Sequence, residues 1–202
     1  LGAWINNNQI IIKTIKNNFT MTIHNLALQG THNIYNSMAA SIAASAIGIK
    51  DEIIKKSLYD FRGIEHRLEF VSRVAGVSFI NDSKATNCNA VYYALETATS
   101  PIIWICGGVD KGNDYSILKD LVQRKVKAII IIGKNGKKIS NSFQKDVDTI
   151  VEVNNMEKAV KTSFEVADAA DTVLLSPACS SFDLFKNYEE RGRAFKNAVL
   201  SI

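Results

Sequence analysis

Residues 128–132 read Ala-Ile-Ile-Ile-Ile, and residues 102–105 read Ile-Ile-Trp-Ile. Neither run alternates between apolar and polar side chains, which predicts two strands that are buried on both faces. Strands of this kind are typical of a parallel sheet that is covered by helices on its two sides. The two runs therefore indicate an α/β fold for the part of the chain that contains them.

Strands and helices are predicted to alternate on both sides of these runs. The other strands are expected at residues 68–74, 77–80, 149–151 and 172–175. The helices are expected at residues 89–98, 115–125, 136–143, 156–169 and 187–200. This alternation predicts a doubly wound α/β domain with right-handed crossovers between parallel strands.

Residues 1–63 have a different pattern, in which asparagines separate short apolar segments as in a small meander. The expected elements are β-like segments at 9–15 and 21–28, an Ala-rich helix that ends near Gly48, and a helix at 50–59. We therefore predict two domains, which comprise residues 1–63 and residues 64–202.

The composition predicts an ordinary soluble globular protein, with 47% hydrophobic and 22% charged residues. A net charge of +4 is too small to indicate a nucleic-acid partner, and the lysines are scattered rather than gathered into a stripe. A small phosphorylated or carboxylated substrate suits this charge balance better.

The location of the protein is predicted to be the cytoplasm. The three cysteines are widely spaced and form no CxxC pair, which favours reduced thiols. The apolar run at 37–49 is shorter than the roughly 20 residues that span a bilayer, so no membrane association is expected. No signal peptide is visible, and the start at Leu1 without a methionine suggests that the chain begins inside a longer polypeptide.

Polar and flexible residues follow three of the predicted strands. The three segments are 81–87 (Asn-Asp-Ser-Lys-Ala-Thr-Asn), 107–114 (Gly-Gly-Val-Asp-Lys-Gly-Asn-Asp) and 176–183 (Ser-Pro-Ala-Cys-Ser-Ser-Phe-Asp). The carboxyl ends of parallel strands meet at one edge of a sheet, where ligands bind. Lysines and hydroxyls gathered there predict a pocket for an anion such as a dicarboxylate. The Asp82 carboxylate could instead accept hydrogen bonds from vicinal hydroxyls, as on a ribose.

Simpler explanations exist for each of these segments. Asp82 or Thr86 could serve only as the N-cap of the following helix, and the glycines could form a flexible turn. Known nucleotide-binding and nucleophile motifs are absent: the glycine segment is not a P-loop, because Asn113 stands where the lysine is required, and no Gly-x-Gly or Gly-x-Ser-x-Gly occurs. The histidines at 24, 32 and 66 match no metal-ligand spacing and are expected to be structural.

Taken together, the motifs resemble those of the Mur ligases of peptidoglycan synthesis. The matching segments are 30–36, 66–69, 81–87, 107–112 and 174–192. The Asp-Ser-Lys-Ala-Thr-Asn form at 82–87 is that of the members that add D-glutamate. The resemblance implies that residues 64–202 form the C-terminal, Rossmann-like, amino-acid-presenting domain. It also implies that residues 1–63 are the end of the central ATPase domain.

The resemblance further implies an ATP-dependent amide ligase that joins D-glutamate to UDP-N-acetylmuramoyl-L-alanine through an acyl phosphate. The nucleotide contacts would be Asn33 and Asn36 for adenine, Arg67 for phosphate and Asp82 for ribose. Lys84 and Lys111 would be the catalytic cations, and Thr86, Lys111, Ser181, Phe182 and Tyr188 would contact D-glutamate. Mg²⁺ would be bound mainly by residues upstream of Leu1, so no metal ligand is assigned here. The full-length form is expected to be monomeric, and this chain alone to be inactive.

Two alternatives remain open from the sequence. One is another amide ligase of the same architecture, similar to folylpolyglutamate synthase. The other is a non-catalytic module that binds a nucleotide or an acidic metabolite.

Overall fold

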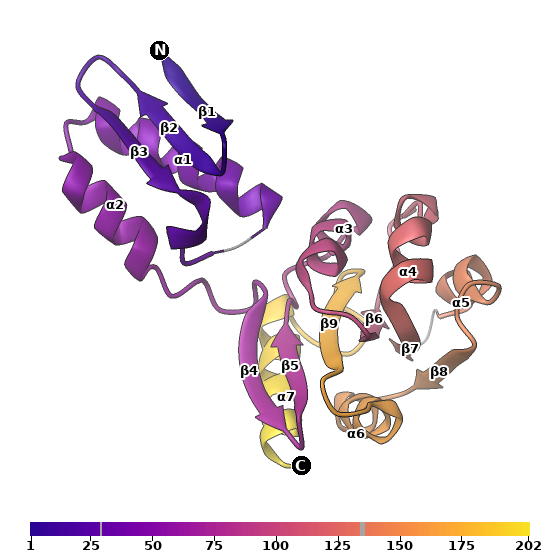
Figure 1. Cartoon of the computed structure of the whole chain (residues 1–202). Coiled ribbons are helices and arrows are strands. Elements are labelled where there is room, and N and C mark those ends of the chain that lie inside the picture. Colours follow the sequence, from indigo (N-terminus) through magenta and orange to yellow (C-terminus); the bar gives the residue numbers. More distant parts are fainter. Residues whose placement is uncertain (29, 134–135) are drawn as a thin grey trace. The chain divides into compact units, whose positions relative to one another are not determined.

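The structure is a computed structural model that describes residues 1–28, 30–133 and 136–202. The chain divides into two compact units, Leu1–Gly63 and Ile64–Ile202, and Figure 1 shows the elements of each. Among the described residues, no helix is both long enough and apolar enough to cross a membrane.

The first unit packs two helices against a three-stranded antiparallel sheet of order β1-β2-β3. Its elements are β1 (Gly2–Asn6), β2 (Gln9–Lys13), β3 (Asn18–Thr22), the short 3-10 helix η1 (Ile23–Asn25), α1 (Thr31–Ala46) and α2 (Asp51–Asp60). The sequence did not predict β1, which is half exposed and lacks a buried face. The strand expected at 21–28 lies earlier, because residues 23–25 turn into η1.

The second unit contains a six-stranded sheet of order β4-β5-β9-β6-β7-β8. Its strands are β4 (Glu69–Val74), β5 (Val77–Asn81), β6 (Ile102–Gly107), β7 (Val126–Ile132), β8 (Thr149–Val153) and β9 (Thr172–Ala178). Only the edge strand β4 pairs antiparallel, and every other pairing of this sheet is parallel. The predicted α/β class with a mostly parallel sheet is therefore confirmed.

Helices cover both faces of this sheet (Figure 1). The helices are α3 (Cys88–Thr97), α4 (Lys119–Lys125) and α5 (Lys137–Phe143) on one face, with α6 (Met156–Val166) and α7 (Tyr188–Leu200) on the other. The helix predicted at 115–125 begins as a 3-10 turn, η2 (Ser116–Leu118), before α4. The helix predicted at 156–169 ends at Val166, because Ala167 already adopts an extended backbone.

Strand β9 is the last strand in the sequence but lies between β5 and β6 in the sheet. Asn81 at the end of β5 pairs with Leu175, and Gly107 at the end of β6 pairs with Ala178. The loops that follow β5, β6 and β9 therefore leave the same edge of the sheet side by side. The reversal of strand order at this place is the position where α/β sheets bind ligands.

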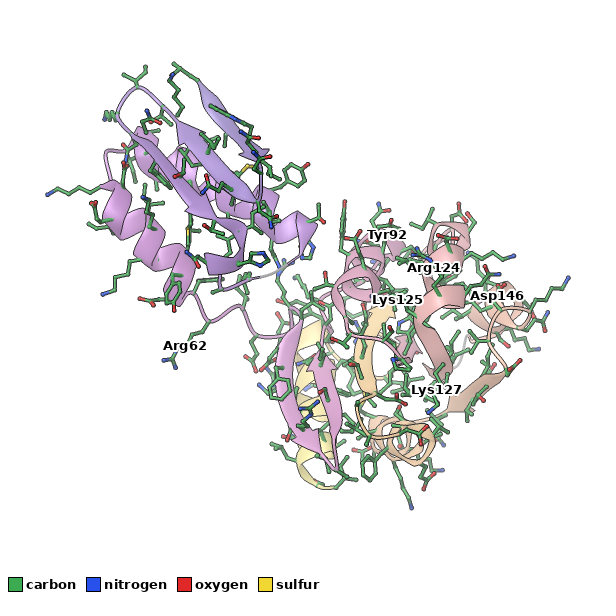
Figure 2. The ribbon with its side chains drawn as sticks, in the orientation of Figure 1. Arg62, Tyr92, Arg124, Lys125, Lys127 and Asp146 are labelled. Carbon is green, nitrogen blue, oxygen red and sulfur yellow. The ribbon has the colours of Figure 1, made fainter. Side chains whose placement is uncertain are left out.

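Lysines at the opposite, amino-terminal edge of the strands are held by protein groups. Lys125, labelled in Figure 2, donates from Nζ to three carbonyl oxygens at the end of α3, at 2.6–2.8 Å. Lys127 pairs with Asp168 at 2.6 Å and with Asp171 at 2.9 Å. These cations stabilise the packing and have little capacity left for a ligand.

Trp104 in β6 is tied to β9, the neighbouring strand at the centre of the sheet. Its indole is fully buried, and Nε1 donates a 2.7 Å hydrogen bond to the carbonyl oxygen of Ser176. Phe143 packs edge-on against the ring, at a centroid distance of 5.6 Å.

We predict that Trp104→Phe lowers the free energy of unfolding of the second unit by about 2 kcal/mol. The change removes buried volume and leaves the Ser176 carbonyl without its donor. Trp4→Phe is the matched control, because Trp4 is 43% exposed, and it should change stability by less than about 0.5 kcal/mol. Urea unfolding followed by far-UV circular dichroism checks both, and equal effects of the two changes would contradict the prediction.

Candidate functional site

Asp82 follows β5 directly and lies in the interior, with 7% of its surface exposed. Its backbone N–H donates to the Leu175 carbonyl at 2.7 Å, which fixes the residue to β9. Its carboxylate accepts hydrogen bonds from the Leu68 N–H at 3.2 Å and from the Ser176 hydroxyl at 2.9 Å. Each carboxylate oxygen keeps a second lone pair, so the group can still accept a hydrogen bond from a ligand hydroxyl.

Burial raises the pKa of Asp82 to about 7. The hydrogen bonds from Ser176 and Leu68 and the charge of Arg67 act in the opposite direction, but they do not offset the loss of solvation. A donor or a cation supplied by a ligand would favour the ionised carboxylate.

Asp82 and Thr86 are not helix caps, so the simpler explanation for them is wrong. The N-cap of α3 is Asn87, whose side-chain oxygen accepts a 2.9 Å hydrogen bond from the Ala90 N–H. Thr86 is half-buried next to this cap. Neither side chain is needed to start the helix.

Arg191 joins the loop after β5 to the loop after β9. It is 1% exposed, and its guanidinium donates to the Ser83 hydroxyl and carbonyl at 3.0 and 2.9 Å and to the Cys179 carbonyl at 3.1 Å. Burial lowers its pKa to about 10. The sequence reasoning did not single out this residue, because an arginine in a helix is normally expected at the surface.

Gly107 ends β6 and Gly108 follows it, and both glycines allow close contact with other backbone segments of the protein. A Cβ on Gly107 would lie 2.3 Å from the Ile132 carbonyl oxygen, and one on Gly108 would lie 2.2 Å from the Ser180 carbonyl oxygen. Val109 and Ser180 form an isolated antiparallel bridge, with N–H to O distances of 2.9 and 3.2 Å. The segment is therefore a fixed link between two loops and not a flexible turn.

Asp110 shapes the rest of this loop. Its Oδ1 accepts from the N–H groups of Gly112 and Asn113 at 2.6 and 3.0 Å, and its Oδ2 accepts from the Tyr115 hydroxyl at 2.7 Å. Burial alone would raise its pKa, but these hydrogen bonds and that of Lys138 hold the pKa below its ordinary value. An aspartate two residues before a glycine is the sequence signal that could have identified this turn.

The two lysines predicted to be catalytic lie at this carboxyl-terminal edge. The Nζ of Lys84 lies 3.7 Å from the centroid of the Tyr188 ring, and the Nζ of Lys111 lies 6.0 Å from that of Phe182. Within the described part of the chain neither ammonium forms an ion pair. Both lysines therefore remain available to an anion, unlike Lys125 and Lys127.

Ser181 is 3% exposed at the start of the turn that leads to α7. Its carbonyl accepts from the N–H groups of Leu184 and Phe185 at 3.2 and 2.9 Å. Phe182, the next residue, is 67% exposed, and α7 is capped by Asn187 rather than by either serine.

Arg67 lies in a strained segment beside Asp82. His66 and Leu68 on either side of it have positive φ angles of 67° and 45°, which are uncommon for residues other than glycine. The His66 carbonyl accepts from the Lys84 N–H at 3.1 Å, and the Leu68 N–H donates to Asp82. These bonds hold the segment, and the Arg67 side chain remains exposed.

Glu65, His66 and Glu69 are close enough to share a cation. Lys196 already occupies that role, with Nζ 3.0 Å from Glu65 and 2.6 Å from Glu69. The Nδ1 of His66 is taken by the Asn81 amide at 2.9 Å. We therefore assign no metal to this group.

Asn33 and Asn36, the predicted adenine contacts, belong to the first unit. Both lie in the first two turns of α1, where a spacing of three residues puts side chains on one face. Asn33 is half-buried and Asn36 is exposed. The remaining predicted contacts, from Arg67 to Tyr188, belong to the second unit.

Comparison with known proteins identifies the second unit. Residues 66–179 match the family model for the Mur ligase, glutamate ligase domain, which is more than half of the chain. The chain belongs to the Mur ligase family. This confirms the resemblance, since the match includes the loops after β5 and β6 and the beginning of the loop after β9.

Several curated relatives of the chain carry the same name. The chain is 51% identical, over all of its length, to the UDP-N-acetylmuramoylalanine–D-glutamate ligase of Christiangramia forsetii, and 46% identical over 99% of its length to that of Porphyromonas gingivalis. The chain spans only about 45% of each relative.

Solved structures of other ligases share the fold. A pseudomurein peptide ligase type C from Methanothermus fervidus superposes with a TM-score of 0.70 at 20% identity, and covers 98% of this chain and 40% of its own. The UDP-N-acetylmuramate–alanine ligase of Thermotoga maritima gives 0.67 at 18% identity, over 96% and 44% of the two chains. A bifunctional folylpolyglutamate synthase from Yersinia pestis gives 0.65 at 14%, over 98% and 45%.

We predict that Gly108→Ala destabilises the second unit by about 3 kcal/mol or more, because the new Cβ meets a backbone oxygen that cannot move without breaking the Val109–Ser180 bridge. Gly112→Ala is the matched control. Its φ of 89° is also positive, but a Cβ there meets nothing within 4 Å, so only a backbone cost of about 1 kcal/mol is expected. Urea unfolding measures both, and a smaller loss for Gly108→Ala than for Gly112→Ala would refute the role of the bridge.

We also predict a pH dependence of stability that Asp82→Asn removes. Because the pKa of Asp82 is raised to about 7 in the folded state, from about 4 in an unfolded chain, the folded state binds a proton that the unfolded state has lost. The free energy of unfolding therefore falls as the pH rises from about 4 to about 7, and this contribution is constant above that. Unfolding of both proteins at pH 5 and pH 8 tests this, and parallel pH profiles would contradict it.

Proposed function

We propose that this chain supplies the amino-acid site and part of the nucleotide site of an ATP-dependent ligase that joins D-glutamate to UDP-N-acetylmuramoyl-L-alanine. The observation that supports this most directly is the gathering of Lys84, Lys111 and Ser181 on adjacent loops at one edge of the sheet. Two ammonium groups that pair with no carboxylate among the described residues, together with a buried serine, suit a ligand with two carboxylates.

In this proposal, residues from the loops after β5, β6 and β9 have different roles. Lys84 and Lys111 would bind carboxylates and offset negative charge as the amide bond forms, and the hydroxyls of Thr86 and Ser181 would fix the orientation of D-glutamate. Phe182 would line the site with aromatic surface, and the backbone near Tyr188 would contact D-glutamate. The effect of these residues is to hold the amine of D-glutamate where it can attack an activated carboxyl group.

The nucleotide contacts are proposed on chemical grounds. Asp82 has free acceptor capacity for ribose hydroxyls, and the exposed Arg67 beside it suits a phosphate. In the first unit, Asn33 and Asn36 offer the amide groups that could read an adenine edge. ATP would supply the phosphoryl group that activates the acceptor carboxylate, and Mg²⁺ would offset its charge. The residues present fit the nucleoside part of ATP; no Mg²⁺ ligand is assigned among them.

Further parts of the proposal concern the whole protein. We infer that residues 1–63 complete a central ATP-binding domain and that residues 64–202 present the amino acid. We also propose a cytoplasmic, monomeric enzyme, as suits a pathway that uses a UDP-sugar and ATP.

We predict that Lys111→Ala and Ser181→Ala, each made in the full-length protein, raise the KM for D-glutamate at least several-fold. Each removes a group that binds the substrate carboxylates, and a charged hydrogen bond is worth about 1.5–3 kcal/mol. Lys119→Ala is the control, because Lys119 is an exposed lysine on α4 that pairs with Asp146 at 3.9 Å.

Phosphate release that depends on D-glutamate is the measurement. Unchanged D-glutamate kinetics in both variants would overturn the assignment of Lys111 and Ser181. Activity with L-glutamate but not D-glutamate would favour the folylpolyglutamate synthase-like alternative, and ligand binding without phosphate release would favour a non-catalytic module.

A further inference from the structure

Among the described residues, Lys84 and Tyr188 form the tightest cation–aromatic contact at this edge of the sheet. The Lys84 ammonium lies 3.7 Å from the ring centroid, well inside the range of about 6 Å in which such contacts are attractive. Both residues are half-buried, so water only partly weakens the attraction. The comparable contact of Lys111 with Phe182, at 6.0 Å on an exposed ring, lies at the limit of that range.

The Tyr188 ring is also packed against a buried histidine, His66. The imidazole of His66 packs edge-on against it, with a centroid distance of 5.9 Å and an interplanar angle of 86°. His66 is 2% exposed, and its Nδ1 accepts a 2.9 Å hydrogen bond from the Asn81 amide. Asn81 is oriented in this sense because its Oδ1 accepts from the Ser83 N–H. A Cβ on Gly192 would lie 2.2 Å from the imidazole, so only glycine leaves room for it there.

The residue before Lys84 is also bonded to the backbone of Tyr188. The hydroxyl of Ser83, next to Lys84, donates a 2.8 Å hydrogen bond to the carbonyl of Tyr188. Ser83 is fully buried and is also held by Arg191. These hydrogen bonds therefore fix the backbone from which the Tyr188 ring and the Lys84 side chain extend.

We propose that Tyr188 is a positioning residue for Lys84, and that the face of its ring holds the ammonium in place before the anionic substrate binds. A free lysine side chain samples many rotamers, and ordering it on binding costs affinity. A ring that restricts these rotamers in the free protein removes part of that cost. The inference rests on the proposed function, in which Lys84 binds a carboxylate of D-glutamate.

Glu189 is the other charged group that could hold Lys84. A hydrogen bond from the Tyr188 side chain is the main cause that lowers the pKa of Glu189, and the charge of Lys84 contributes less. Glu189 is half-buried, and in the described chain it forms no ion pair with Lys84 within 4 Å. If the Tyr188 ring holds Lys84, Tyr188→Leu should release the lysine. If the Glu189 carboxylate holds it, Glu189→Gln should do so.

The kinetic test uses Tyr188→Leu, Tyr188→Phe, Lys84→Met and the double variant Tyr188→Leu/Lys84→Met in the full-length protein. Tyr188→Leu should raise the KM for D-glutamate about 3- to 10-fold with kcat within about twofold, since a positioned ground-state contact is lost. Tyr188→Phe keeps the ring and should recover most of this loss. In the Lys84→Met background, Tyr188→Leu should change KM by less than about twofold. Phe70→Leu, at a 62% exposed ring on β4, is the matched control.

Nuclear magnetic resonance provides a test that does not depend on activity. The Cε protons of Lys84 should show an upfield ring-current shift that Tyr188→Leu abolishes and that Tyr188→Phe and Glu189→Gln preserve. A shift that is absent in the unmodified protein, or lost in Glu189→Gln, would overturn the inference.

The remaining outcomes separate the inference from the proposed function. An equal effect of Tyr188→Leu with and without Lys84, or a fall in KM, would refute the positioning role while D-glutamate activity is intact. If the unmodified protein shows no phosphate release that depends on D-glutamate, the proposed function fails. The ring-current shift then decides whether Tyr188 holds Lys84.

Discussion

The position of β9 between β5 and β6 is the constraint on which the rest of the second unit depends. In the sheet, β6 is separated from β5 by the width of one strand, and β7 and β8 follow β6 outward. After α6 the chain returns to the centre of the sheet, where β9 occupies the position between β5 and β6. In this position β9 is completely buried, and the carboxyl ends of β5, β6 and β9, which are far apart in the sequence, lie side by side. The apolar character of β6, β7 and β9 is therefore a condition for the site, because any misplacement of these strands would separate its loops.

Buried polar contacts then set the loops to within hydrogen-bond distances. Asp82 is tied to β9 through Leu175 and Ser176, and the Val109–Ser180 bridge ties the loop after β6 to the loop after β9. Arg191 closes the arrangement from α7 with bonds to main-chain carbonyls rather than to a carboxylate. A buried cation of this kind has a high desolvation cost, which only a fully satisfied set of acceptors can offset. The loops are consequently preorganised before any ligand is present.

Much of this could be predicted from the sequence, because the signals are local. Runs such as 128–132 identified the buried strands, and the turn residues placed the polar loops at strand ends. The long-range facts could not be predicted from pattern alone. The residues next to Arg191 in the sequence do not indicate that it is buried. In the same way, the residues around Gly107 and Gly108 do not indicate that these glycines contact distant backbone segments. For the site, the convergence of loops was accessible, whereas the roles of individual residues in binding remain predictions.

The distribution of lysine partners gives the two edges of the sheet different chemistry. At the amino-terminal edge, Lys125 and Lys127 are saturated by carbonyl and carboxylate oxygens at 2.6–2.9 Å. At the carboxyl-terminal edge, Lys84 and Lys111 face aromatic rings instead. An aromatic face attracts an ammonium without supplying a full negative charge, so it can orient the lysine and still leave its charge to be neutralised by a ligand. A carboxylate at the same place would compete with an anionic substrate for the cation. In the proposed site, the Tyr188 ring would therefore reconcile two demands that oppose each other, because it fixes the Lys84 ammonium and leaves its charge available to a ligand.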